Sequence, residues 1–252
     1  MNLNPKAQVE LFHLMFLRQF NMQIDTNLYA IKGDCNLRLF FSSVRYSEDL
    51  NLDIYTVAQE TLENKVNKLL TSPPLLKLLQ SYGITQLEVT AFKQTPTTQQ
   101  WKVQIHTEQA EMPYHTKIEF SWRNEKIQTE LASVDMKICQ AYRLPPMRLS
   151  HYRLADAITQ KVLALAHRSL TQARDIFDLY FLLHLGKPKL SFSLKKNTLA
   201  QAEEALLSIS FADYKFQVIN FLEPEGQAIY DNKDYWATIS NEAFHYLNGL
   251  EK

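Results

Sequence analysis

The sequence predicts an α+β protein, with a mixed β-sheet and flanking helices in an N-terminal domain and a helical C-terminal domain. Strand and helix patterns alternate before the two adjacent prolines, Pro145-Pro146, whereas helical spacing dominates from residue 151 onward. Paired prolines between segments of different character are typical of a domain boundary. We therefore predict two domains, 1–145 and 146–252.

Composition limits the classes of function. Acidic and basic residues number 27 each among 252 residues, so no general basic field indicates nucleic acid, although a neutral chain can still carry a local basic patch. The two cysteines, Cys35 and Cys139, lie in no CxxC motif or His cluster, which argues against a zinc site or a disulfide framework. Without a signal-like N-terminus or a membrane-length apolar run, we expect a cytoplasmic protein with no membrane partner.

The elements of the first domain follow from periodicity. Residues 6–20 have apolar side chains at helical spacing, and His13 among them is expected to be a packing or surface residue rather than a ligand. "LYAIKGD" is a short apolar run that ends in Gly-Asp, and "CNLRLFFSS" can form one or two helical turns. "DLNLDIYTV" alternates, which predicts a strand whose polar face carries Asp49, Asn51 and Asp53.

Further helices and strands complete the prediction. Residues 58–81 predict a helix that breaks near Pro73-Pro74. Four strand patterns follow, "QLEVTAFKQT", "QWKVQIHTE", "TKIEFSW" and "DMKICQAY", with "PTTQ" as a turn between the first two. Helical patterns cover 151–185, 197–209 and about 237–250. Gly83 and Gly186 come after apolar-periodic runs and are expected at helix ends.

The stretch from Ile31 to Tyr55 combines a Gly turn, a short helix and a strand with a polar face, three parts that in this order suit a metal-bound nucleotide. Same-face residues of a strand are about 6.5–7 Å apart, so two carboxylates can converge on one divalent cation or a close pair. A Gly-containing turn that enters a helix presents backbone N–H groups to phosphates. Each part alone is weak evidence, whereas their ordered combination over about 20 residues is much stronger.

The same stretch, "KGDCNLRLFFSSVRYSEDLNLDI", resembles the signature of the AbiEii/AbiGii-type toxin family, nucleotidyltransferases of the DNA polymerase β-like superfamily. The family pattern is Lys-Gly-Gly-x-x-Leu-Arg, followed by Arg-x-Ser-x-Asp-hydrophobic-Asp. The matching residues are Lys32, Gly33, Leu37, Arg38, Arg45, Ser47 and Asp49. The resemblance implies that the N-terminal domain has the nucleotidyltransferase fold.

Two later segments extend the resemblance over about residues 28–185. "TKIEFSW" resembles the strand with the family's third acidic residue, here Glu119. "HYRLADAITQKVLALAHRSLTQARDIFDLYFLL" resembles the helical module. Its matching residues are Lys161, Arg168, Arg174, Asp175 and Asp178.

The resemblance implies a role for each matched residue. Asp49, Asn51 and Glu119 would hold Mg²⁺ or Mn²⁺, and Glu119 could assist deprotonation of the acceptor. Gly33 would contact the triphosphate of the NTP. The other candidates for binding the nucleotide are Lys32, Asp34, Arg45 and Ser47. Lys161 would steady phosphate charge, and Asp175 or Asp178 would orient that lysine or the acceptor.

The resemblance also implies a biological role. The chain would transfer a nucleotidyl group from an NTP to an RNA, such as tRNA, or to a protein. It would be the toxin of a toxin–antitoxin or phage-defence pair, and its partner would be a cognate antitoxin, often a winged-helix DNA-binding protein. The alternative is a catalytically degenerate chain that keeps the fold as a non-enzymatic interaction protein.

Two departures from the family pattern leave three interpretations open. Asp34 stands where the family has Gly or Ser, and Asn51 stands where it has the second strand Asp. Asn51 should weaken Mg²⁺ binding, and a carboxylate beside the phosphates should repel them. Either the site is disabled, or Asp34 supplies the missing ligand, or metal binding rests on Asp49 and Glu119 with Asn51 as a neutral oxygen ligand. Asp53, about 13 Å along the strand from Asp49, is a poor substitute.

Structural alternatives accompany several of these residues. Asp34 suits the N-cap of a helix that starts near Cys35. Asp178 could be the buried partner of an arginine, and Arg45 could merely shape the turn before the strand, as could Ser47. An ion-pair network is at least as well supported as catalysis for three residues of the helical module, Arg168, Arg174 and Asp175.

Overall fold

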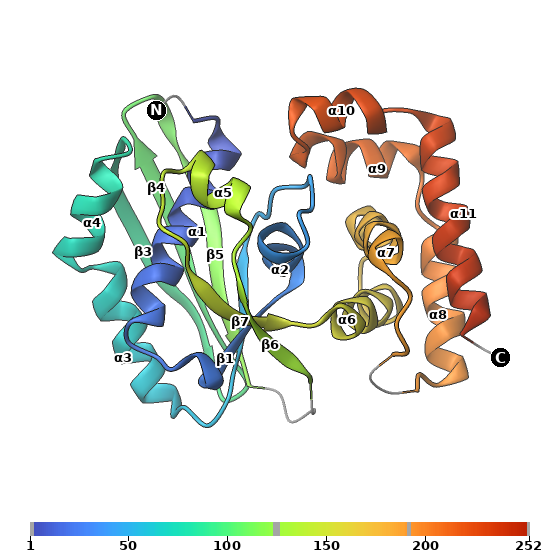
Figure 1. The fold of residues 1–252 in the computed structure, drawn as a ribbon, viewed down its shortest axis with the longest axis horizontal. Coiled ribbons are helices and arrows are strands. Elements are labelled where there is room, and N and C mark those ends of the chain that lie inside the picture. The colour runs from blue at the N-terminus through green and yellow to red at the C-terminus, as the bar shows by residue number, and fades with distance from the viewer. Residues whose placement is uncertain (1–2, 123–126, 191–192, 251–252) are drawn as a thin grey trace. The chain divides into compact units, whose positions relative to one another are not determined.

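The computed structural model describes residues 3–122, 127–190 and 193–250 (Figure 1). Its contacts divide the chain into two compact units. The first unit comprises Met1–Phe40 and Tyr46–His151, and the second comprises Phe41–Arg45 and Tyr152–Lys252. The short segment Phe41–Arg45 therefore belongs to the C-terminal unit, although it directly follows the turn and helix singled out in the sequence.

The first unit contains a sheet and five helices among its described residues. Its elements in chain order are α1 (Pro5–Asn21), β1 (Tyr29–Lys32), α2 (Gly33–Phe40), β2 (Leu50–Ile54), α3 (Gln59–Leu70), α4 (Pro73–Gln80), β3 (Ile84–Thr95), β4 (Thr98–Thr107), β5 (Ala110–Ser121), β6 (Thr129–Ser133), α5 (Met136–Ala141) and β7 (Arg148–Tyr152). The described strands form a seven-stranded sheet in the order β3-β4-β5-β2-β1-β7-β6. The predicted α+β class with a mixed sheet is confirmed, because β2 pairs parallel to β5 and antiparallel to β1.

The sheet has one apolar face and one polar face around its centre. Leu50, Leu52 and Ile54 of β2 are buried in the hydrophobic core with residues of α1, α3 and α4, which lie over this face (Figure 1). Strand alternation turns the two intervening residues, Asn51 and Asp53, to the opposite face. This alternation explains why the short polar motif of the sequence does not enter the core under α1.

One predicted strand is a helix. The segment "DMKICQAY" forms α5, since the Asp135 side chain caps the helix by accepting a hydrogen bond from the Lys137 backbone N–H at 2.8 Å. The strands that complete this edge of the sheet are β6 and β7, which the sequence analysis did not predict. Strand β7 follows Pro145-Pro146 and pairs parallel to β1 through Ile31 and His151.

His13 lies in the core of the first unit, where it links α1 to the sheet. Its Nε2 is 2.7 Å from Thr116 Oγ1, and the Thr116 hydroxyl donates to the Glu48 carbonyl at 2.7 Å. His13 Nε2 must therefore carry the hydrogen. Burial lowers the pKa of His13 from 6.5 to about 3, so the imidazole is neutral in the folded chain at neutral pH.

Acidification is expected to destabilise the fold through His13. The unfolded state takes up a proton near pH 6.5 whereas the folded state does so only near 3, so stability is lost as the pH falls below 6.5. Between pH 7 and pH 5 this amounts to about 2 kcal/mol of unfolding free energy. Urea denaturation at pH 7 and at pH 5 measures how much unfolding free energy is lost between the two, and His13→Gln should lose about 2 kcal/mol less than the natural chain. His115→Gln, which removes an exposed imidazole from β5, should keep the full difference; equal differences in the two variants would contradict this assignment.

The second unit is helical, as predicted for the C-terminal part. Its described elements are α6 (Leu154–His167), α7 (Ala173–Leu185), α8 (Lys196–Leu207), α9 (Phe211–Gln217), α10 (Pro224–Tyr230) and α11 (Lys233–Gly249). Helix α6 packs against α7 and α8, and α11 packs against α7 and α8. Gly186 ends α7, which confirms its predicted position, and α9 and α10 are additional to the prediction. Among the described residues, no helix combines the length and the apolar character needed to cross a membrane.

Candidate functional site

The Gly33 turn lies directly beside the strand with the polar motif. Gly33 has a φ of +66°, a conformation that favours glycine, and it begins α2 immediately after β1 ends at Lys32. A Cβ on Gly33 would lie 3.6 Å from Asn51 Nδ2, so the backbone approaches the Asn51 side chain closely. Sequence reasoning placed these two residues 18 positions apart in one motif, and the fold brings them together.

Asp34 is not the N-cap of α2. The helix begins at Gly33 rather than near Cys35, so Asp34 lies inside the first helical turn. A carboxylate there interacts favourably with the helix dipole, by roughly 0.3–1 kcal/mol at an exposed site. This local stabilisation gives Asp34 a structural role beside any role toward a nucleotide.

Sheet register aligns the predicted metal ligands. Asn51 of β2 is the Cα partner of Glu119 of β5 in the parallel pairing, and the preceding pair is Leu50 with Ile118. Asp49 comes one residue before Leu50, so it extends the polar face of Asn51 and Glu119 by one step. Asn51 and Glu119 therefore share one face of two neighbouring strands, and Asp49 lies in the bend directly before β2, next to that face.

The two carboxylates have different partners. Asp49 Oδ2 lies 3.1 Å from Lys117 Nζ, and both side chains are about one-third exposed, at 30% and 32%. Glu119 accepts hydrogen bonds from neutral donors, Gln100 Nε2 and, at 3.4 Å, Ser121 Oγ. Lys117 and Gln100 were not predicted as site residues, and they enter the arrangement through the pairing of β5 with β2 and β4.

Lys32 and Asp53 form a buried ion pair on the same face. Lys32 Nζ is 2.5 Å from Asp53 Oδ1, and the side chains are 4% and 0% exposed. Asp53 is thus paired with a lysine, which agrees with the expectation that it is a poor substitute for the carboxylate that the family has at position 51. Contact between Lys32 and a nucleotide stays a prediction.

Side chains of neighbouring residues hold the Asp49 backbone in place by hydrogen bonds to its carbonyl. The Ser47 hydroxyl donates to the Asp49 carbonyl at 2.7 Å, and Cys35 Sγ lies 3.4 Å from the same oxygen. Burial raises the pKa of the Cys35 thiol to about 12, so it remains a protonated donor. Ser47 therefore shapes the turn before β2, whereas nucleotide binding by Ser47 stays a prediction.

The helical unit brings together the other predicted residues in a buried ionic cluster. Lys161 Nζ lies 2.6 Å from Asp178 Oδ2 and 3.1 Å from Asp175 Oδ1. Arg45 binds Asp178 in a bidentate manner, with Nε to Oδ1 at 3.1 Å and Nη2 to Oδ2 at 2.6 Å. Arg168, which is 41% exposed, lies 2.7 Å from Asp175 through its Nε. Asp178 is therefore the buried partner of an arginine, as one alternative proposed.

The buried centre of this cluster holds two cations and two carboxylates, and Arg168 adds a third, partly exposed cation. Arg45, Lys161, Asp175 and Asp178 are each at most 2% exposed. Buried carboxylates and cations persist in proteins when they pair with one another and satisfy their hydrogen bonds. The ion pairs account for the burial of these groups, and catalytic roles for Lys161 and Asp175, like nucleotide binding by Arg45, stay predictions.

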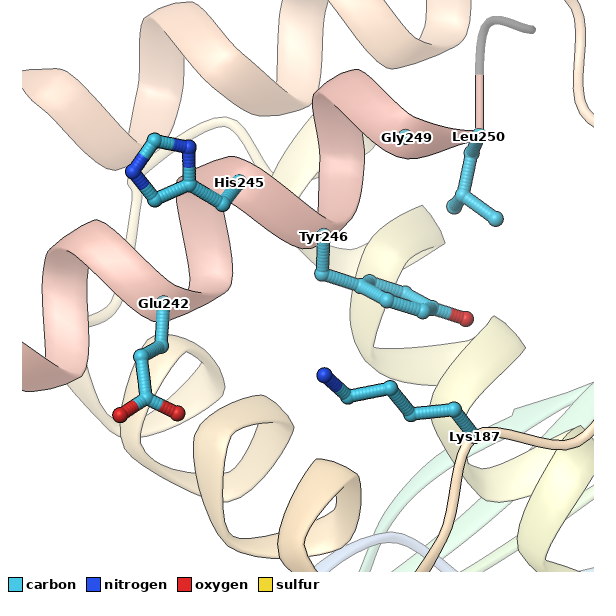
Figure 2. Close-up of a pocket in the computed structure, with 6 residues that line it drawn as sticks. All are labelled: Lys187, Glu242, His245, Tyr246, Gly249 and Leu250. Atoms are coloured by element: carbon cyan, nitrogen blue, oxygen red, sulfur yellow. The ribbon is translucent and has the colours of Figure 1, made fainter.

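A pocket of about 490 Å³ in the helical unit contains none of the predicted site residues (Figure 2). It lies along the C-terminal end of α11, and Figure 2 shows the Lys187 side chain extending beneath the ring of Tyr246. The lining residues are Lys187, Glu242, His245, Tyr246, Gly249 and Leu250. This pocket has neither paired carboxylates nor a glycine turn, so the polar face of the sheet is the stronger candidate.

The donor atoms on the polar face suit a hard divalent cation but carry little charge for one. Asp49, Asn51 and Glu119 offer carboxylate and amide oxygens, the donors that Mg²⁺ and Mn²⁺ accept. Only two of the three are charged, and Asp49 already has a lysine partner. In the described part of the chain, no group of three or more His, Cys, Asp or Glu residues is arranged to hold a metal ion. The residues thus fit such a cation in donor chemistry and lack one carboxylate.

Two solved structures have folds similar to that of this chain. JHP933 from Helicobacter pylori has a TM-score of 0.56 and 18% identity, with 100% of both chains covered. A candidate nucleotidyltransferase from H. pylori has a TM-score of 0.57 and 18% identity, with 96% of both chains covered. At this identity the likenesses concern the fold alone, and they show that the chain shares the fold of these two proteins over nearly its whole length.

Its sequence then defines the family. The family model described as "Nucleotidyl transferase AbiEii toxin, Type IV TA system" matches residues 16–242, and the chain belongs to this family. The resemblance inferred from the motifs is thereby confirmed, and the family implies an antitoxin partner. A comparison with curated proteins gives no match.

Proposed function

We propose that the chain transfers a nucleotidyl group from an NTP to an RNA, such as a tRNA, or to a protein, as the toxin of its toxin–antitoxin pair. One observation carries the proposal. Asn51 and Glu119 are paired on neighbouring strands, with Asp49 directly before β2, beside the positive-φ turn at Gly33. Oxygen donors for a metal and a backbone turn for phosphates are the two parts that nucleotidyl transfer needs in one place.

Each part has a role in this proposal. The turn at Gly33 binds the triphosphate through backbone N–H groups at the start of α2, where the helix dipole favours an anion. Asp49, Asn51 and Glu119 hold Mg²⁺ or Mn²⁺, which neutralises phosphate charge when bound. Glu119 accepts the proton of the acceptor hydroxyl at a carboxylate oxygen as the acceptor oxygen bonds to the α-phosphorus and pyrophosphate leaves, and Gln100 orients that carboxylate.

The local environment supports fixed positions for these groups. Hydrogen bonds to the Asp49 carbonyl hold the backbone that carries the first carboxylate, and β-sheet pairing holds Asn51 opposite Glu119. Catalysis by positioning depends on such rigidity, since a displacement of about 1 Å can cost about a hundredfold in rate. Asp34 opposes the proposal, because a carboxylate close to phosphates repels them by up to a few kcal/mol in a partly shielded site.

Isothermal titration and label transfer test the proposal together. We expect at least one NTP to bind in the presence of Mg²⁺ and to bind more weakly with EDTA. With radiolabelled NTP, we expect transfer to tRNA, to other RNA or to protein, and loss of transfer by at least a hundredfold in Asp49→Asn. Asp25→Asn, at an exposed site in the same unit, is the matched control and should retain transfer. Absence of transfer with all four NTPs, with either Mg²⁺ or Mn²⁺, would reject the enzymatic function.

The second candidate is a non-enzymatic interaction protein that keeps the nucleotidyltransferase fold. The observation that favours it is the pairing of Asp49 with Lys117 beside a neutral Asn51, which leaves little negative charge for a metal. Under this candidate, the chain binds its antitoxin but neither binds nor transfers a nucleotide. Copurification with the antitoxin, together with a negative titration for every NTP, would distinguish it from the enzyme.

A further inference from the structure

Lys117 is placed beside Asp49 by the register of the sheet. In the parallel pairing of β2 with β5, Leu50 lies opposite Ile118 and Asn51 lies opposite Glu119. Asp49 and Lys117 each come one residue before the first of these pairs, so both side chains project from the same polar face. The resulting ion pair has a separation of 3.1 Å between Lys117 Nζ and Asp49 Oδ2. Backbone pairing therefore keeps an ammonium group next to the first predicted metal ligand.

The ammonium changes the charge available to a cation. Asp49 and Glu119 contribute two negative charges, Asn51 contributes none, and Lys117 removes one. These four side chains together thus carry a net charge of about −1, which is low for a divalent site built from hard oxygen donors. A positive group within a few ångströms also repels a divalent cation directly.

We propose that Lys117 is a tethered cation that competes with a divalent metal for Asp49. This inference rests on the proposed function, because the metal site is the one suggested there. The side chains of Lys117 and Asp49 are each about one-third exposed, so the lysine can move into solvent when a metal binds. Lys117 consequently sets the concentration of metal at which the site fills.

Lys102 provides a matched control on the neighbouring strand. It is the Cα partner of Lys117 in the antiparallel pairing of β4 with β5, so it lies on the same face. Its ammonium lies 3.4 Å from the centroid of the Phe92 ring rather than beside a carboxylate. Lys102→Gln removes the same charge from the same face and leaves the pair of Asp49 and Lys117 intact.

Titration of Mn²⁺, followed by the electron paramagnetic resonance signal of the free ion, tests the competition without any assay of activity. We expect Lys117→Gln to bind one Mn²⁺ with a dissociation constant about tenfold lower than that of the natural chain. Lys102→Gln should change the constant by about twofold or less, because a more distant exposed charge is screened. Adding Asp49→Asn to Lys117→Gln should abolish the gain in affinity for Mn²⁺.

Two results would overturn the competition. One is an equal dissociation constant in Lys117→Gln and Lys102→Gln, and the other is a gain that survives Asp49→Asn. Asn51→Asp separates this inference from the proposed function. If Asn51→Asp gains affinity for Mn²⁺ and Lys117→Gln does not, the metal site stands and the competition is wrong. If neither variant binds Mn²⁺, both the competition and the metal site fail.

Discussion

Replacing Asp178 by Asn is expected to lower the free energy of unfolding by about 3–5 kcal/mol. Asp178 is fully buried and holds two cations, the Arg45 guanidinium and the Lys161 ammonium, through contacts as short as 2.6 Å. Asparagine keeps the shape but removes the charge, so the cluster is left with buried positive charge that it no longer balances. Urea denaturation measures the loss, and hydrogen exchange of the α6 and α7 amides should locate it in the helical unit.

Asp231→Asn is the matched control for this prediction. It makes the same chemical change in the same unit, where Asp231 pairs with Lys215 at 2.9 Å and both side chains are well exposed, at 38% and 49%. Exposed ion pairs contribute about 0–1 kcal/mol, so the control should remain close to the natural chain. If Asp178→Asn were no less stable than Asp231→Asn, the cluster could not be a structural element of the helical unit.

The polar face illustrates what sequence periodicity can predict. Alternation in "DLNLDIYTV" was sufficient to predict β2 and to place Asp49 and Asn51 on one face, since side chains of a strand alternate with a period of two. The same alternation in "TKIEFSW" places Lys117 on the face of Glu119. The pairing of β5 with β2 is a long-range property, however, and only the structure shows that Lys117 meets Asp49.

The ionic cluster of the helical unit shows a similar limit. Asp175 and Asp178 are three residues apart on α7, so their sharing of one helix face follows from sequence spacing alone. The arginine that binds Asp178 is 133 positions away in the chain, in a short segment that precedes β2. No local pattern indicates that Phe41–Arg45 belongs to the helical unit, because tertiary packing decides it.

The prediction of a strand at "DMKICQAY", where the structure has α5, was wrong for a local reason. "DMKICQAY" alternates over only a few residues, and so short an alternating run does not distinguish a strand from a short amphipathic helix. The deciding signal was Asp135, whose side chain caps the first turn, and it was available in the sequence. Capping residues therefore carry more information than alternation in segments of about six residues.

Combining Asp34→Ser with Asn51→Asp is expected to strengthen Mg²⁺-dependent NTP binding by about a hundredfold, if the two departures disable the site. Each exchange should contribute about tenfold: the first removes a carboxylate from the phosphate turn, and the second restores a charged metal ligand. Serine is preferable to glycine because position 34 lies inside α2, where glycine costs about 1 kcal/mol relative to alanine. Isothermal titration of each NTP, with and without Mg²⁺, measures the gain.

The double variant Asp231→Ser with Asn232→Asp is its control, since it makes the same two exchanges on the exposed surface of the helical unit. It should bind nucleotides as the natural chain does.

The single variant Asp34→Ser then separates the interpretations that the sequence left open. If Asp34 repels the triphosphate, Asp34→Ser alone should bind an NTP more tightly than the natural chain. If Asp34 instead replaces the missing strand carboxylate as a metal ligand, the same variant should bind the NTP more weakly, and only Asn51→Asp should recover the loss. A natural chain that binds NTP with Mg²⁺, and is unaffected by either exchange, would leave Asp49 and Glu119 as the two carboxylates on which the metal depends.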